Sequence, residues 1–212
     1  MRERAGVTIV AVMLSLIAMT TGCSVLPPSP DNTQFYVLTA LTVDSTTSAS
    51  SATSHLAIGL GPVKLPAYLD HPEVVTRVAS NRLDLSPNDR WAEPLDESFR
   101  RILAINLGGL LGTNEILPFP WDLSTPVDYK IEVNVGRFER DGSGGTQLLG
   151  DWVIRDGRSN RALMSRQASF AENAGTGMEG AAAALSADLS DLSKQIADAV
   201  IELNQRQTRA AN

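Results

Sequence analysis

The sequence predicts a single α/β domain in which a mixed β-sheet is flanked by two main helices, preceded by a signal segment and a tether. Residues 128–138 alternate between apolar and polar side chains, as expected of a half-buried strand. Residues 94–111 and 179–203 instead carry apolar side chains at helical spacing. With the shorter strand-like runs between them, these segments place one folded domain at 34–204.

Residues 1–22 have the organisation of a secretory signal. Arg2 and Arg4 give it a charged start, a mostly apolar run follows at 7–19, and three small residues precede Cys23. The run is too short to span a bilayer comfortably, because spanning takes roughly 20 residues. Cys23 is the only cysteine of the chain and lies where a signal peptidase would cut. We therefore predict a lipoprotein signal peptide, with acyl chains attached to Cys23.

The segment 23–33 predicts an extended tether, because it is rich in proline and polar residues. Ten residues reach at most about 33 Å, so the domain can stand off the membrane that holds its anchor. Ser24, directly after the cysteine, favours the outer membrane. Thr20 departs from the aliphatic residue that usually lies three positions before a lipidated cysteine. An ordinary secretory signal followed by an incidental cysteine is the alternative.

Short strand-like runs, separated by turn residues, fill most of the domain. Residues 34–40 predict the first strand, whereas 42–54 are rich in Ser and Thr and predict a mobile loop. Residues 205–212 are expected to form a flexible tail. The further strands are predicted at 55–63, 74–79, 82–85, 114–119, 147–155 and 161–170, which with 128–138 gives a sheet of about six to eight strands.

Both helices have recognisable signals in the sequence. Pro94 suits the first turn of a helix, and Gly112 is a natural stop. The helix at 179–203 has an apolar seam with spacings of three and four residues. We expect this seam to pack on the sheet; a helix that also pairs with a neighbouring subunit is the alternative, because the seam resembles a coiled coil.

Charge and motif content narrow the function classes. The formal net charge of −6 argues against binding to nucleic acid. The two histidines, His55 and His71, belong to no metal-ligand or nucleophile motif. We therefore expect no enzymatic activity, no cofactor and no metal site.

Aromatic and charged residues crowd into two predicted loops, 64–70 and 88–95. Trp91 has two interpretations: it covers the edge of the sheet as part of the core, or it anchors a protein interface, where Trp, Tyr and Arg are over-represented. We predict that these two loops form a surface that meets a neighbouring subunit or another partner. Its candidate residues are Pro66, Tyr68, Leu69 and Trp91.

The same part of the chain carries a resemblance to a known family. The segments 58–70 (IGLGPVKLPAYLD), 74–77 (VVTR) and 88–95 (NDRWAEPL) are similar to the ABC-type transport auxiliary lipoprotein family, and the strand-like runs 36–38 and 128–138 also fit. The resemblance covers about 23–204, nearly all of the chain that follows the signal.

The resemblance implies a lipid-anchored α/β domain on the outer membrane, facing the periplasm and without enzymatic activity. It implies that the chain works beside an MCE-domain protein, a permease and an ATPase that move lipids between two membranes. It also implies that copies of the chain form a homo-oligomeric ring. The chain would then dock the periplasmic MCE assembly to the outer membrane. The alternative is a lipid-anchored periplasmic binding protein that carries a small apolar ligand or a glycan. A carrier needs an enclosed, mostly apolar pocket, whereas a docking protein needs an exposed patch.

Overall fold

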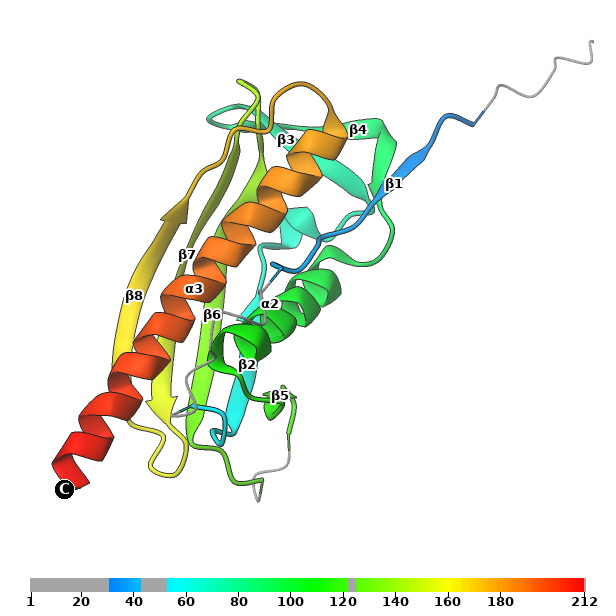
Figure 1. The fold of residues 1–212 in the computed structure, drawn as a ribbon. Helices are drawn as coiled ribbons and strands as arrows, with labels where there is room; N and C mark the ends of the chain where they lie inside the picture. The colour runs from blue at the N-terminus through cyan, green and yellow to red at the C-terminus, as the bar shows by residue number, and fades with distance from the viewer. Residues whose placement is uncertain (1–30, 43–52, 122–124, 212) are drawn as a thin grey trace, which may run out of the picture. The chain divides into compact units, whose positions relative to one another are not determined.

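The computed structural model describes residues 31–42, 53–121 and 125–211. From Thr33 onward these residues belong to one compact unit with a mixed α/β fold, which confirms the predicted fold class (Figure 1). The predicted signal peptide, Cys23 and most of the tether lie outside the described residues.

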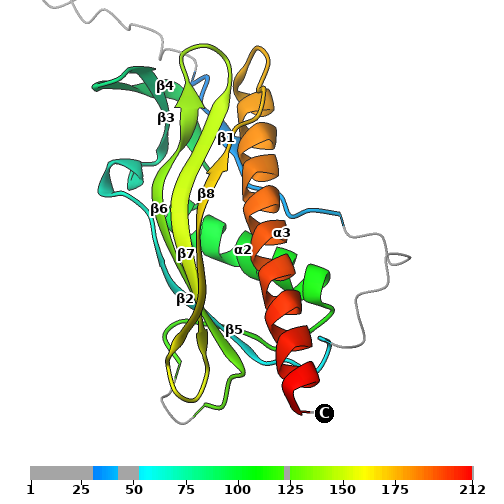
Figure 2. The same ribbon diagram turned by 90° about the vertical axis from the view of Figure 1, so that its left-hand side faces the viewer.

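Eight strands of the described chain form one mixed sheet, with β6 at its centre. Strand β7 pairs antiparallel with β6, and β8 pairs antiparallel with β7 (Figure 2). On its other side, β6 pairs in parallel with β2 near its start and with β3 near its end. The strands are β1 (Gln34–Tyr36), β2 (Ile58–Lys64), β3 (Glu73–Ala79), β4 (Arg82–Trp91), β5 (Ile116–Pro118), β6 (Tyr129–Asp141), β7 (Thr146–Asp156) and β8 (Ala162–Phe170).

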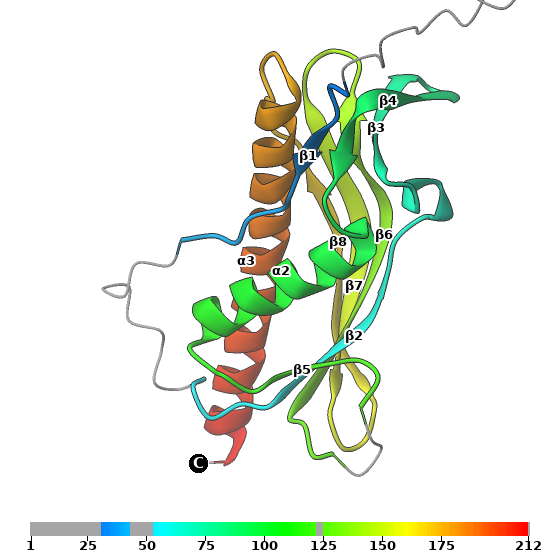
Figure 3. The same ribbon diagram turned by 90° about the vertical axis from the view of Figure 1, so that its right-hand side faces the viewer.

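Two long helices, α2 (Leu95–Leu111) and α3 (Met178–Ala211), lie on the same face of the sheet (Figures 2 and 3). The apolar face predicted for each helix is buried there, and the expected alternation of β6 supplies the opposite wall of the core. Phe99 of α2 meets Phe138 of β6 edge to face, with ring centroids 5.1 Å apart. Neither helix in the described part of the chain is long and apolar enough to cross a membrane.

The segment after β1 is held between the two helices by side-chain hydrogen bonds. The backbone N–H of Thr39 donates to Ser186 Oγ on α3 at 3.1 Å, and that of Leu41 donates to Asn106 Oδ1 on α2 at 2.9 Å. Asn106 also donates through Nδ2 to Ser193 Oγ on α3 at 3.1 Å. Backbone N–H groups that are shielded from water need such partners. These bonds therefore hold the segment after β1 in place between α2 and α3.

The C-terminal ends of β1 and β4 differ from those predicted from the sequence. The strand predicted at 82–85 continues to Trp91, so 88–91 are strand rather than loop. The reason is a long-range pairing, because Gln34–Tyr36 aligns in parallel with the second half of β4. The first predicted strand, 34–40, ends at Tyr36, where the chain turns in between the helices.

The C-terminal boundary also differs, because α3 continues to Ala211 through the segment that was expected to be a flexible tail. The Tyr129 hydroxyl of β6 donates to Gln207 Oε1 at 2.8 Å, and Arg206 pairs with Glu202 one helical turn earlier. The bond from Tyr129 gives the last turns of the helix a distant partner that helical spacing alone could not reveal.

The substitution Leu103→Asp should unfold the domain, because Leu103 is fully buried between α2 and the sheet. An unpaired buried charge costs several kcal/mol. Ile105→Asp, two residues away but 51% exposed, is the matched control and should change the melting temperature little. Thermal unfolding followed by circular dichroism measures both. Equal melting temperatures for the two variants would mean that this face of α2 is not core.

A buried carboxylate, Asp188, lies where α3 packs on β7. Its Oδ2 accepts a hydrogen bond from Thr146 Oγ1 at 2.7 Å, whereas its Oδ1 has no hydrogen-bond partner among the described residues. The pKa of Asp188 is raised to about 6: burial raises it most, the bond from Thr146 opposes this, and the nearby charges of Glu172 and Asp191 add to the rise. The ionised form of Asp188 therefore destabilises the fold at neutral pH.

The substitution Asp188→Asn should stabilise the domain at neutral pH. Because folding raises the pKa, the native state binds the proton more tightly, so stability falls as the pH rises from about 4 to about 6. At pH 7.5 the free energy of unfolding of the variant should exceed that of the unsubstituted protein by roughly 2–3 kcal/mol, and at pH 4 the two should be almost equal. Urea unfolding at both pH values tests this. Asp191→Asn, on the same helix but more exposed, should show no such gain; an equal response of the two variants would refute the assignment to Asp188.

Candidate functional site

A cleft of about 710 Å³ lies between two stretches of chain, 63–72 and 91–96. The first stretch is the end of β2, the short 3-10 helix η1 (Ala67–Leu69) and the loop before β3. The second leads from the end of β4 into α2. Figure 3 shows β2 rising beside the N-terminal end of α2 toward η1. The two predicted loops that were singled out for their aromatic and charged residues therefore meet at one site.

Three of the four candidate residues line this cleft: Pro66, Leu69 and Trp91. Leu69 and Trp91 are buried and belong to the main hydrophobic core, as does Leu95 beside them. Exposed polar side chains, among them Lys64, Asp70, His71 and Asp96, surround this apolar floor. These apolar side chains are already buried in the isolated chain, so a partner in the cleft would meet only small parts of them.

Trp91 is part of the core, as one of its two interpretations proposed. It is the last residue of β4 and only 6% exposed, and its backbone N–H donates to the carbonyl of Pro72 at 2.7 Å. This bond ties the two sides of the cleft together. Whether Trp91 also touches a partner stays a prediction, and truncating it would test stability and binding at once.

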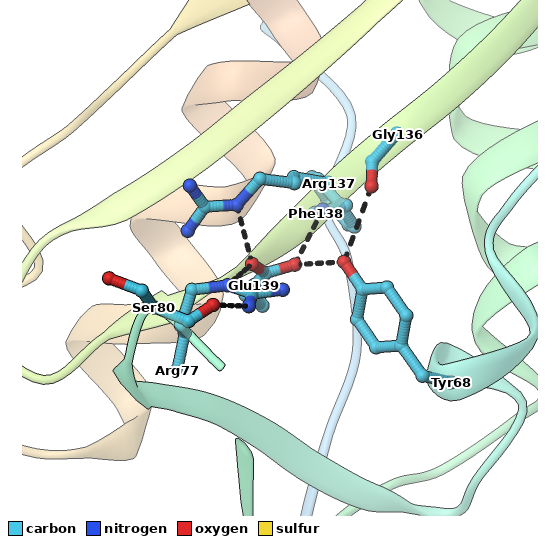
Figure 4. A network of polar contacts seen from close by, with 7 residues as sticks. All are labelled: Tyr68, Arg77, Ser80, Gly136, Arg137, Phe138 and Glu139. Atoms are coloured by element: carbon cyan, nitrogen blue, oxygen red, sulfur yellow. Dashed lines mark hydrogen bonds and ion pairs between the residues drawn. The ribbon is translucent and has the colours of Figure 1, made fainter. Parts of the chain in front are cut away.

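Tyr68, the fourth candidate, does not line the cleft, and its hydroxyl points toward Glu139 of β6 (Figure 4). Its hydroxyl donates to Glu139 Oε2 at 2.5 Å. The guanidinium of Arg77 lies 5.7 Å from the centre of its ring, which adds a cation–π contact. Burial and the bond to Glu139 together raise the pKa of Tyr68 to about 12, so the phenol stays protonated and remains a donor.

Glu139 is the centre of this polar network, and its side chain is fully buried. Its Oε1 accepts from Arg77 Nε at 2.7 Å and from Arg137 Nε at 2.8 Å, while its Oε2 also accepts from the backbone N–H of Phe138 at 3.1 Å. Burial alone would raise the pKa of Glu139, but the donors Tyr68, Arg77 and Arg137 bring it below its ordinary value. The carboxylate is therefore ionised and fully satisfied.

The network joins three elements, because Tyr68 belongs to η1, Arg77 to β3 and Glu139 to β6. It therefore holds η1, which forms one wall of the cleft, against β6 at the centre of the sheet. The sequence analysis missed this role of Glu139. The available signal was a break in alternation, since the apolar residue after Val135 is Phe138 and not residue 137; the pairing of β6 with β7 shifts register between Val135 and Arg137.

The described residues offer little for metal or acid–base chemistry. No group of three or more His, Cys, Asp or Glu side chains in 31–42, 53–121 and 125–211 is arranged to hold a metal ion. Asp70 and His71 are both exposed at the rim of the cleft.

Comparison with known proteins identifies the family. Residues 36–197 match the ABC-type transport auxiliary lipoprotein component, so the chain belongs to that family and is an auxiliary lipoprotein component of an ABC-type transport system. No curated protein matches it significantly. The resemblance drawn from the segments at 58–70, 74–77 and 88–95 is thereby confirmed.

Solved structures share the fold. Protein XCC0632 from Xanthomonas campestris is 15% identical, with a TM-score of 0.67 over 83% of this chain and 99% of that one. A second structure, described as an uncharacterized protein, is 19% identical, with a TM-score of 0.65 over 79% of this chain and 98% of that one. At such identities the likeness concerns the fold alone.

The substitution Glu139→Gln should destabilise the domain by about 3–5 kcal/mol, because it leaves the guanidinium groups of Arg77 and Arg137 without their buried counter-charge. Urea unfolding measures the loss. Glu132→Gln is the control, because Glu132 lies on the same strand and pairs with a single, partly exposed Arg155. We expect at most about 1 kcal/mol there. Similar losses for the two variants would contradict a special role of Glu139.

Proposed function

We propose that this chain is a non-catalytic lipoprotein of the outer membrane that docks a periplasmic MCE assembly of a lipid transport system. The family supports the transport role, since auxiliary lipoproteins work beside the transporter rather than as its permease or ATPase. The observation that carries docking is the cleft, whose apolar floor is held rigid by the Glu139 network and surrounded by polar side chains.

Attachment to the membrane is the first part of the proposal. Cys23 carries the acyl chains, and the segment 23–33 spaces the domain from the outer membrane, on its periplasmic side. Stable anchoring takes more than one chain, because each buried methylene contributes roughly 0.8 kcal/mol. A triacylated cysteine meets that requirement.

The substitution Cys23→Ser should abolish lipid attachment, because it removes the only thiol of the chain. Cells labelled with an alkyne-bearing fatty acid should incorporate the label into the unsubstituted protein and not into the variant, and the variant should leave the membrane fraction. Ser24→Ala, next to it, is the control and should still be labelled. Continued labelling of Cys23→Ser would refute the anchor.

Contact with partners is the second part. The MCE-domain protein meets the cleft directly, the permease and ATPase act through it, and copies of this chain form a ring around the contact. Pro66, Leu69 and Trp91 shape the surface, and Tyr68 holds η1 in place.

A carrier of a small apolar ligand or glycan is the second candidate, because a volume of about 710 Å³ lies in the range of small-molecule sites. The mixed lining of the cleft favours the docking role. Extraction of the purified protein followed by mass spectrometry separates the two, since a carrier should release a bound ligand in stoichiometric amount.

The substitution Ala67→Arg should block docking without unfolding the domain, because Ala67 is exposed and lines the cleft. Pull-down of the MCE-domain protein should fall at least about tenfold, as for the loss of a central contact. Ala79→Arg, exposed at the end of β3 and outside the cleft, is the control and should bind normally. Undiminished binding by Ala67→Arg at an unchanged melting temperature would rule out the cleft as docking site.

A further inference from the structure

Strand β1 and the residue after it carry exposed apolar side chains directly behind the tether. Phe35 is 64% exposed and Val37 is 49% exposed, whereas Tyr36 between them packs against the core. Successive side chains of an extended segment point to opposite sides, so Phe35 and Val37 face away from the core together. We call these two residues the β1 patch. Single exposed apolar residues are common on protein surfaces, but two on one short segment form a patch that another molecule can cover.

The body of the protein holds the β1 patch in place. Strand β1 pairs in parallel with β4, and the carbonyl of Tyr36 accepts a hydrogen bond from the N–H of Ala92 at 2.9 Å. Behind the patch, Leu38 is buried, and the N–H groups of Thr39 and Leu41 are bonded to α3 and α2. The patch is therefore a fixed part of the surface of the folded domain.

Two charged side chains of β4 next to the patch already have partners. Arg90, which aligns with Phe35, pairs with Glu73 at 3.3 Å. Asp89 accepts a hydrogen bond from the Tyr36 hydroxyl at 3.0 Å. Removing water from a charge costs most when that charge is unpaired. Covering the β1 patch therefore leaves neither Arg90 nor Asp89 without a partner.

The length of chain before β1 identifies what covers the patch. Ten residues of tether reach at most about 33 Å, so acyl chains on Cys23 keep β1 near the surface of the membrane. Strand β5 and the C-terminal end of α3 lie at the opposite end of the sheet (Figures 1 and 3). A short tether makes the contact intramolecular, with an effective concentration in the millimolar range, so a small patch is sufficient.

We propose that the β1 patch rests on the membrane that carries the acyl anchor, with Phe35 at the boundary between lipid headgroups and acyl chains. Aromatic and aliphatic side chains of surface-bound segments lie at this depth. The contact turns β5 and the C-terminal end of α3 away from the membrane. It also holds the cleft close to the membrane, because Ala92, which is bonded to Tyr36, lines the cleft. The inference rests on the proposed function only for the anchor at Cys23.

Fluorescence quenching by lipids tests this contact without the MCE partner. The full acylated chain is reconstituted into vesicles of phosphatidylethanolamine and phosphatidylglycerol with brominated acyl chains, which quench only nearby indoles. Phe35→Trp places the reporter in the patch, and Phe119→Trp, 50% exposed beside β5, is the matched control. The unsubstituted chain gives the baseline from Trp91, Trp121 and Trp152. Brominated lipid should cause a loss of fluorescence beyond this baseline for Phe35→Trp and not for Phe119→Trp.

Adding Val37→Asp to the Phe35→Trp chain should abolish the extra quenching, because it places a charge in the patch. Adding Ile105→Asp instead, which is 51% exposed on α2, should leave the quenching unchanged. Flotation of the protein with the vesicles shows that the anchor at Cys23 is in place. In floated vesicles, no extra quenching of Phe35→Trp, equal quenching of both reporters, or equal effects of the two aspartates would each overturn the proposal. Those results would leave the Ala67→Arg docking test standing.

Discussion

The buried carboxylate of Glu139 is the interaction on which the site depends. A charge at the centre of a fold is costly unless it is paired, and here two guanidinium groups, a phenol and a backbone N–H pair it completely. These donors come from η1, β3 and β6, which are far apart in the sequence. One carboxylate therefore sets the position of the 3-10 turn that forms a wall of the cleft. The same requirement explains why Tyr68 faces inward.

The arrangement of the sheet explains why a cleft exists next to this network. Strand β6 pairs with both β2 and β3 on the same side, so β2 and β3 must separate where the chain passes through η1. Strand β5 covers only the start of β2, and α2 begins at the far wall. The cleft is thus bounded by secondary structure on several sides. A site carried by paired strands and a helix is more rigid than one on a free loop.

Sequence reasoning recovered the parts of the structure whose signals are local. The spacing of apolar residues in α2 and α3, the alternation of β6 and the stop at Gly112, which adopts a left-handed conformation with φ 68°, all lie within short windows. It missed what depends on distant partners. The second half of β4 is a strand because Gln34–Tyr36 pairs with it. Tyr68 turns inward because its hydroxyl donates to Glu139, which lies 71 positions later in the sequence. The crowding of aromatic and proline residues led to Pro66, Leu69 and Trp91, which line one cleft, and their contact with a partner stays a prediction.

Amide hydrogen exchange of η1 tests the central claim most directly. The N–H groups of Leu69 and Asp70 donate to the carbonyls of Pro66 and Ala67, at 3.0 and 3.1 Å, so their exchange reports on the turn itself. In Tyr68→Phe, which removes only the hydroxyl bound to Glu139, exchange at these two amides should rise at least about tenfold while the interior of α2 is unaffected. Unchanged exchange of Leu69 and Asp70 in that variant would contradict the claim that the Glu139 network holds the cleft in place.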